Sequence, residues 1–133
     1  MLATIIFIID QVIKGFVRTR LAIGGSLVRF GPFSITRFEN TGGPFSLPLS
    51  QSFLLIAHFA VLFGAIFAWK RFPTYRSALL WIIAGGASNL IDRLLFHQTT
   101  DYIGLPFGGF WNLADVSVLI GLLMLAFAKP YKN

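Results

Sequence analysis

Four long apolar runs divide the chain, and short polar or basic segments separate them. They cover about residues 2–17, 52–69, 78–96 and 113–128. A helix needs roughly 20 residues to cross the hydrocarbon core of a bilayer, and the two middle runs come near that length. The runs are continuous and do not alternate with polar positions, as the strands of a membrane barrel would. The pattern therefore predicts an all-α membrane fold with four transmembrane helices in up-down order.

The connection between the first two runs, about residues 18–51, is long enough to hold structure of its own. Two segments in it, 27–30 and 33–38, are rich in branched and aromatic residues with polar ones between them, and a glycine-proline pair at 31–32 separates them. Such a pattern is typical of two short strands joined by a turn. We expect a small β-sheet here, lying on the membrane surface, within a single integral membrane domain that covers residues 1–133.

The composition favours lipid as the surroundings of the chain. Of its 133 residues 56% are hydrophobic and 12% are charged, and the mean hydropathy is +0.75. Soluble domains have about 25% charged residues, and a domain this small could not bury so much apolar surface. The absence of cysteine excludes disulfides, thiolate nucleophiles and thiolate metal sites. A net charge of +6 fits attraction of the protein to anionic lipid headgroups. Nucleic acid is not expected as a partner, because the sequence contains no basic patch in a polar setting.

The up-down order determines which connections share a side of the membrane. The first connection and the third, His97–Asn112, lie on one side, whereas the basic second connection, Lys70–Arg76, lies on the other side with the basic tail. Short basic loops favour the cytoplasm, although the first connection is basic as well. We expect the first run to be a retained helix, because no basic region and no cleavage site mark it as a signal peptide. All five carboxylates then fall on the side opposite the second connection: Asp10, Glu39, Asp92, Asp101 and Asp115.

Acids inside or beside apolar runs are the main functional candidates, since an aspartate at a helix centre costs about 2.5–3.5 kcal/mol on insertion scales. Asp10 and Lys14 are four residues apart, a spacing that predicts an ion pair on one helical face. Asp92 is expected to accept hydrogen bonds that brace neighbouring helices. Asp101 could be an ordinary loop residue, and Asp115 could be a helix N-terminal acid stabilised by the helix dipole.

Other polar side chains are weaker candidates for chemistry. Asn40, Asn89 and Asn112 lie in or beside apolar segments, where each is expected to bridge backbone or carboxylate groups, and one of them could hold substrate. His58 is expected to be a packed core residue, and the two histidines lack the spacing of a zinc site. The segment Gly85–Ser88 predicts a small-residue face that allows close helix contact. We expect neither a metal nor a cofactor.

Paired carboxylates offer acid–base chemistry that needs no metal. Asp101 and Asp115 flank an apolar, glycine-rich loop, and the second of them begins the fourth apolar run. Two close carboxylates share a proton, so that the ionised one can take a proton from an attacking water while the protonated one donates to an amide carbonyl. Two alternatives remain open: a small ion channel or transporter that uses the acids as a proton or cation path, and an inactive homologue or assembly factor.

Five motifs occur in order along nearly the whole chain: Asp10-x-x-x-Lys14; Glu39-Asn40-Thr41-Gly42-Gly43-Pro44-Phe45-Ser46; Gly85-Gly86-Ala87-Ser88-Asn89-Leu90-Ile91-Asp92-Arg93; Asp101-Tyr102-Ile103; and Trp111-Asn112-Leu113-Ala114-Asp115. By these motifs the chain resembles lipoprotein signal peptidase (signal peptidase II), a family of bacterial intramembrane aspartic proteases. The resemblance implies four spanning helices, a small extracytoplasmic sheet, and Asp101 and Asp115 as the catalytic dyad. It also implies residues that contact substrate or support the site, namely Asn40, Asn89, Asp92, Arg93, Asn112 and Asp10.

The resemblance further implies a substrate and a location. The substrate would be a prolipoprotein whose cysteine already carries diacylglycerol, and the chain would cut just before that cysteine. The protein would be a multi-pass protein of the bacterial cytoplasmic membrane, with its active site on the extracytoplasmic side and with membrane lipids around it. Separately from the resemblance, we expect a monomer. We also expect the loop Gly104–Phe110 to form a short flap over the cut site.

Overall fold

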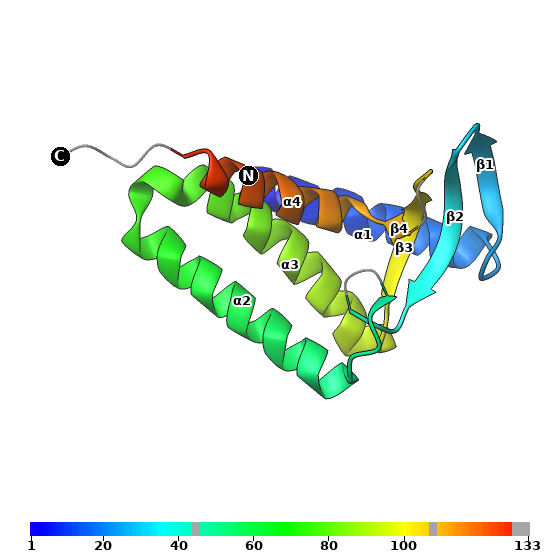
Figure 1. The fold of residues 1–133 in the computed structure, drawn as a ribbon, viewed down its shortest axis with the longest axis horizontal. Coiled ribbons are helices and arrows are strands. Elements are labelled where there is room, and N and C mark those ends of the chain that lie inside the picture. Colours follow the sequence, from blue (N-terminus) through cyan, green and yellow to red (C-terminus); the bar gives the residue numbers. More distant parts are fainter. Residues whose placement is uncertain (44–45, 107–108, 129–133) are drawn as a thin grey trace.

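The computed structural model describes residues 1–43, 46–106 and 109–128. Within these ranges the helices are α1 (Leu2–Arg20), α2 (Gln51–Arg71), α3 (Arg76–Phe96) and α4 (Leu113–Ala126), with a 3₁₀ turn, η2 (Pro73–Tyr75), between α2 and α3. The helices extend along the long axis of the molecule, and a small sheet lies at one end of them (Figure 1). The expectation of a helical protein with a small sheet is thus confirmed.

The helix boundaries follow local signals in the sequence. α1 continues to Arg20, three residues beyond the predicted range. α2 begins after Ser50, whose hydroxyl accepts a hydrogen bond from the backbone N–H of Phe53 and so caps the helix. α3 ends at Phe96 because His97 adopts a left-handed conformation with φ of 58°. The basic tail, residues 129–133, lies outside the described residues.

α3 is the central helix, since it packs against α1, α2 and α4. A Cβ atom added to Gly85 would collide with the backbone carbonyl of Ala114 on α4, and one added to Gly86 would lie 3.0 Å from the side chain of Leu62 on α2. The predicted small-residue face is therefore present, and it serves two neighbouring helices.

The helices expose large apolar side chains, as expected of a protein surrounded by lipid. Phe63 on α2 is 76% exposed. Other exposed large apolar residues on α1 and α2 are Leu2, Ile5, Ile8, Ile9, Val12, Phe16, Phe53, Ile56, Phe59, Val61, Ile66 and Phe67. By length and composition, two helical segments could cross a membrane, Gln51–Arg71 and Pro73–Phe96, and α4 is apolar but shorter.

The sheet has four antiparallel strands in the order β1 (Ser26–Phe30), β2 (Phe33–Asn40), β3 (Thr99–Gly104) and β4 (Phe110–Trp111). β1 and β2 form the predicted pair around the turn at 31–32. The expectation that the sheet belongs to the first connection alone was wrong, because β3 and β4 come from the third connection. Since β3 pairs with β2 across some sixty residues of sequence, neither segment by itself indicated that contact.

Candidate active site

A groove of about 850 Å³ lies between α2 and α4, with α3 beneath it and the sheet at one end. Asp101 and Asp115 both line it, together with Asn40, Asn89 and Arg93. Its other walls are largely apolar and include Phe53, Ala57 and Val61 on α2 and Val118, Leu119 and Leu122 on α4. The structure thus brings five of the eight predicted site residues to one apolar groove.

Asp101 is the third residue of β3 and is only 2% exposed. Its Oδ1 accepts a hydrogen bond of 2.7 Å from Nδ2 of Asn112, and its Oδ2 accepts one of 3.4 Å from Nδ2 of Asn40. Burial, followed by repulsion from the charge of Asp115, raises the pKa of Asp101 to about 7. At neutral pH this carboxyl can therefore hold or release a proton.

Asp115 is the third residue of α4, where it forms a capping box with Asn112. The backbone N–H of Asp115 donates to Oδ1 of Asn112 at 2.8 Å, and the backbone N–H of Asn112 donates to Oδ2 of Asp115 at 3.2 Å. Nδ2 of Asn89 donates to Oδ1 of Asp115 at 2.8 Å. The position at a helix N-terminus, with two donors, stabilises negative charge on this carboxylate.

Asn112 joins the two acids. Its side-chain amide donates to Asp101, while its backbone N–H donates to Asp115. The residue is fully buried and has no freedom to turn without breaking the helix cap. One asparagine therefore holds both carboxylates in a defined relative orientation.

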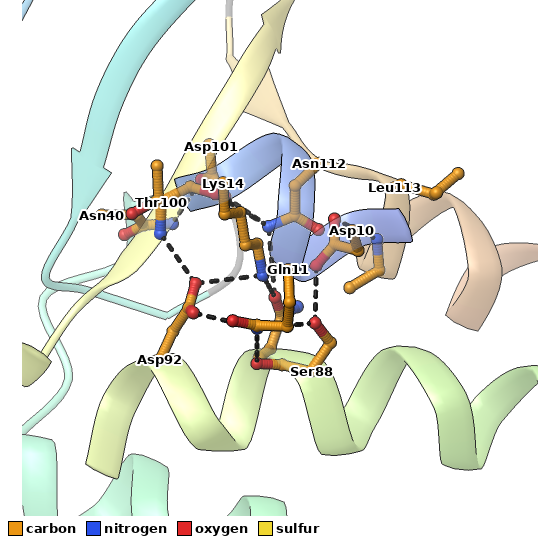
Figure 2. Close-up of polar contacts among 12 residues, drawn as sticks. Asp10, Gln11, Lys14, Asn40, Ser88, Asp92, Thr100, Asp101, Asn112 and Leu113 are labelled. Atoms are coloured by element: carbon orange, nitrogen blue, oxygen red, sulfur yellow. Dashed lines mark hydrogen bonds and ion pairs between the residues drawn. The ribbon is translucent and has the colours of Figure 1, made fainter. Parts of the chain in front are cut away.

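A network of ionic and polar side chains lies between α1 and α3 (Figure 2). Lys14 Nζ is 2.7 Å from Asp10 Oδ2 and 3.0 Å from Asp92 Oδ2, and all three side chains are fully buried. Nζ also donates to Oδ1 of Asn89 at 2.8 Å. The ion pair predicted from the spacing of Asp10 and Lys14 is present, but it is part of a larger cluster that also reaches Asn89, a partner of Asp115.

Asp10 connects four elements of the fold. Its Oδ2 accepts a hydrogen bond from the hydroxyl of Ser88 at 2.6 Å, and its Oδ1 accepts bonds from Tyr102 OH at 3.0 Å and from the backbone N–H of Ala114 at 3.2 Å. The Tyr102 hydroxyl in turn accepts from the backbone N–H of Leu113. Asp10 thus fixes the start of α4 relative to α1, α3 and β3.

Asp92 braces neighbouring elements, as the sequence predicted. Its Oδ1 accepts from Gln11 Nε2 at 3.1 Å and from Arg18 Nη1 at 3.3 Å, and its Oδ2 accepts from the backbone N–H of Thr100 at 3.2 Å. The side chain points away from the groove and toward α1 and β3. Neither Asp92 nor Asp10 is among the residues that line the groove.

Arg93 ties the segment before α2 to α3. Its Nη2 donates to the backbone carbonyl of Gly42 at 2.6 Å, and its Nη1 lies 3.5 Å from Oε1 of Gln51. Arg93 is one of the residues that line the groove with both acids. It supplies positive charge on the wall of that groove.

Sequence reasoning missed several polar residues of this region. Tyr102, Gln11 and Arg18 all bond to Asp10 or Asp92. A polar stripe at helical spacing along the otherwise apolar α1, running from Asp10 through Lys14 to Arg18, could have indicated part of this network.

Two further expectations can be compared with the structure. His58 was expected in the packed core, but it is partly buried and lines the groove, with Nδ1 2.7 Å from the Leu54 carbonyl. The predicted flap, Gly104–Phe110, includes residues 107–108, which lie outside the described residues, as do residues 44–45 of the second motif. In the described ranges no group of three or more histidines and acids is arranged to hold a metal ion.

The fold and the groove define a helical membrane protein that directs two carboxyl groups into an apolar binding site. The family described as "Signal peptidase (SPase) II" matches residues 2–129. A lipoprotein signal peptidase of Moorella thermoacetica is 30% identical over 131 residues, which cover 94% of this chain and 87% of the relative. One of Pseudomonas aeruginosa is 31% identical over 142 aligned positions, covering 94% and 83%.

Solved structures agree with these sequence matches. A bacterial membrane enzyme determined by the in meso method at 2.3 Å resolution superimposes with a TM-score of 0.85 at 26% identity, covering 98% of this chain and 91% of that one. A second, at 1.9 Å, gives a TM-score of 0.85 at 27% identity. The chain belongs to the signal peptidase II family, and it is accordingly a membrane-bound peptidase of that type.

Proposed function

We propose that this peptidase removes the signal peptide from diacylglyceryl-modified prolipoproteins, and that Asp101 and Asp115 activate the water that cuts the chain before the lipidated cysteine. The observation that carries the proposal is that both carboxyl groups line one apolar groove and are joined by Asn112. Its relatives are named lipoprotein signal peptidases, which supports the substrate class.

The two acids would have different roles. Asp101, with its pKa near 7, holds a proton in a large fraction of molecules at neutral pH. Asp115, at the N-terminus of α4 with donors from Asn89 and Asn112, is the ionised member. This division matches the requirement for one general base and one general acid.

The reaction would proceed through a tetrahedral intermediate. Asp115 takes a proton from water as the water oxygen bonds to the carbonyl carbon, and Asp101 donates its proton to the carbonyl oxygen. The intermediate then returns a hydroxyl proton to Asp101, while the protonated Asp115 gives its proton to the leaving amine. The C–N bond breaks, and both acids regain their starting protonation states.

The groove suits a substrate that is itself a membrane segment. Apolar walls from α2 and α4 offer contacts for acyl chains and for an apolar signal peptide, and the acids lie toward the sheet at its end. We further propose that α1 to α4 all span the bilayer in up-down order as one domain of residues 1–133. The site would open on the extracytoplasmic side of the bacterial cytoplasmic membrane, and a monomer would suffice.

The test is incubation of the purified protein in detergent micelles with a diacylglyceryl-modified prolipoprotein, followed by a gel shift. Asp101→Asn and Asp115→Asn should each abolish cleavage. Glu39→Gln is the matched control, because Glu39 is a sheet carboxylate that pairs with Arg37 and lies outside the groove. Cleavage retained in either aspartate variant would overturn the assignment of Asp101 and Asp115 as the catalytic dyad. Failure of the wild-type protein to cleave this precursor would overturn the proposed substrate class.

A further inference from the structure

Two residues that line the groove each carry a buried polar atom without a hydrogen-bond partner. Among the described residues, three buried side-chain atoms have no hydrogen-bond partner: Trp69 Nε1, Arg93 Nε and Thr99 Oγ1. Arg93 and Thr99 line the same groove as Asp101 and Asp115. An unpaired buried polar group costs stability, and such groups are uncommon in folded proteins. Their gathering beside the acids indicates that a ligand supplies the missing partners.

Thr99 is positioned to meet a ligand that reaches Asp101. It is the first residue of β3, two residues before Asp101, and alternate residues of a strand point to the same face. Thr100, between them, points to the opposite face, where its hydroxyl donates to Glu39 and accepts from Arg18. Thr99 is only 3% exposed, so its hydroxyl has little access to solvent.

We propose that the Thr99 hydroxyl is a substrate-positioning donor, which binds a carbonyl oxygen of the substrate close to the bond that is cut. This inference rests on the proposed function. A carbonyl oxygen fits because it accepts hydrogen bonds, and Thr99 O–H and Arg93 Nε–H are both unpaired donors that belong to residues lining the groove. Two residues along a strand span roughly 6.6 Å, so the bound oxygen lies within about two residues of the reacting carbonyl.

The neighbouring strand offers a threonine with an ordinary structural role. Thr36 on β2 is 6% exposed, and its hydroxyl bonds to Ser26 Oγ at 2.7 Å and to Ser34 Oγ at 2.9 Å. It is not among the residues that line the groove. Thr36→Val is therefore a matched control for Thr99→Val, because both changes replace a buried strand hydroxyl with a methyl group of similar size.

The experiment measures cleavage of a diacylglyceryl-modified precursor and thermal unfolding of the same samples. Thr99→Val should lower kcat/KM about five- to tenfold, the effect of losing one neutral hydrogen bond to substrate, without lowering the melting temperature. Thr99→Ser keeps the hydroxyl and should stay within about twofold of wild type. Thr36→Val should lower the melting temperature and leave kcat/KM unchanged, since its hydroxyl bonds only within the fold.

A second substrate distinguishes whether the carbonyl that binds Thr99 belongs to the peptide or to the lipid. Diacylglycerol carries ester carbonyls, whereas a dialkylglyceryl ether precursor keeps only the amide carbonyls of the peptide. A defect of Thr99→Val with both substrates identifies a peptide carbonyl, and a defect with the ester substrate alone identifies a lipid ester.

Two results would overturn the proposal: wild-type kcat/KM in Thr99→Val, or a loss of melting temperature in Thr99→Val equal to that of Thr36→Val. Failure of the proposed function is recognised separately. It would appear as an inactive wild-type protein or as an active Asp101→Asn variant in the same assay.

Discussion

Lys14 on α1 and Asp92 on α3 form an ion pair of 3.0 Å in which neither side chain is exposed. Lys14 also pairs with Asp10 and donates to Asn89, so one cation neutralises two buried carboxylates and orients an amide that holds Asp115. The pair therefore connects the packing of two helices to the proposed dyad.

Removal of the Lys14 charge should destabilise the protein strongly. Lys14→Met leaves Asp10 and Asp92 buried without their shared cation, and breaking a buried ion pair in this way costs about 3–5 kcal/mol. Thermal unfolding in detergent micelles measures the effect. Lys70→Met is the control, because Lys70 is exposed at the end of α2 and should unfold at the wild-type temperature. Equal melting temperatures for the two variants would show that the cluster contributes little.

Asn112 caps the N-terminus of α4 and donates a side-chain hydrogen bond to Asp101, and substitution can separate these two roles. Serine is a good N-cap residue, so Asn112→Ser should keep the stability of α4 but lose the side-chain donor to Asp101 and Asn89. We expect Asn112→Ser to unfold at a higher temperature than Asn112→Ala and to lose about two- to tenfold in kcat, since a neutral hydrogen bond contributes about 0.5–1.5 kcal/mol. Asn112→Ala should lose both roles and about 1 kcal/mol of stability as well. Full activity in Asn112→Ser would contradict the orienting role.

Activity should fall as the pH rises above about 7. The pKa of Asp101 is raised to about 7 by burial and by Asp115, and the proposed mechanism uses Asp101 in its protonated form as the general acid. A profile of kcat/KM between pH 5 and pH 9 in micelles should therefore show a descending limb with a midpoint near 7, because kcat/KM reports the pKa values of the free enzyme. A kcat/KM that is constant or rises through this interval would be incompatible with the assignment of Asp101 as the acid.

The same carboxyl should make the stability of the fold depend on pH. The folded protein holds the Asp101 proton up to about pH 7, whereas the unfolded chain releases it near pH 4. The folded state binds more protons in between, so the stabilisation that Asp101 itself contributes is fully present below about pH 4 and is lost as the pH rises to about 7. Asp101→Asn removes this contribution. The melting temperature of the variant minus that of the wild type should therefore increase from pH 5 to pH 8. If this difference in melting temperature is constant over the interval, the pKa of Asp101 is not raised.

Close approach of α3 and α4 at Gly85 should be essential for the site. Gly85→Ala introduces a Cβ atom that collides with the backbone carbonyl of Ala114, which has no room to move because its N–H is held by Asp10. We expect a loss of about 1–3 kcal/mol from overpacking and reduced cleavage, because α4 carries Asp115. Gly64→Ala on α2 is the control, since no atom lies within 4 Å of the added Cβ. It should be neutral or slightly stabilising.

Much of the fold and part of the site could be predicted from local sequence. Helix formation by the apolar runs and the strand pair around 31–32 depend on neighbouring residues, so hydrophobic pattern and turn chemistry are sufficient to indicate them. The pairing of Asp10 with Lys14 likewise follows from helical spacing. The motif order was enough to identify the family, which the match over residues 2–129 confirmed.

The tertiary structure alone decided how these pieces meet. Pairing of β3 with β2 brings Asp101 opposite Phe38 and Thr99 opposite Asn40, contacts that no local pattern contains. Helix packing directs Asp92 toward Lys14 and directs Asn89 and Asp115 into the groove. Sequence by itself determined which segments are apolar and which acids and amides are present, because these are properties of single residues and short windows. Long-range packing decides which acids share a groove and which hydroxyls stay without a hydrogen-bond partner. This packing exists only when all the helices and strands are folded together.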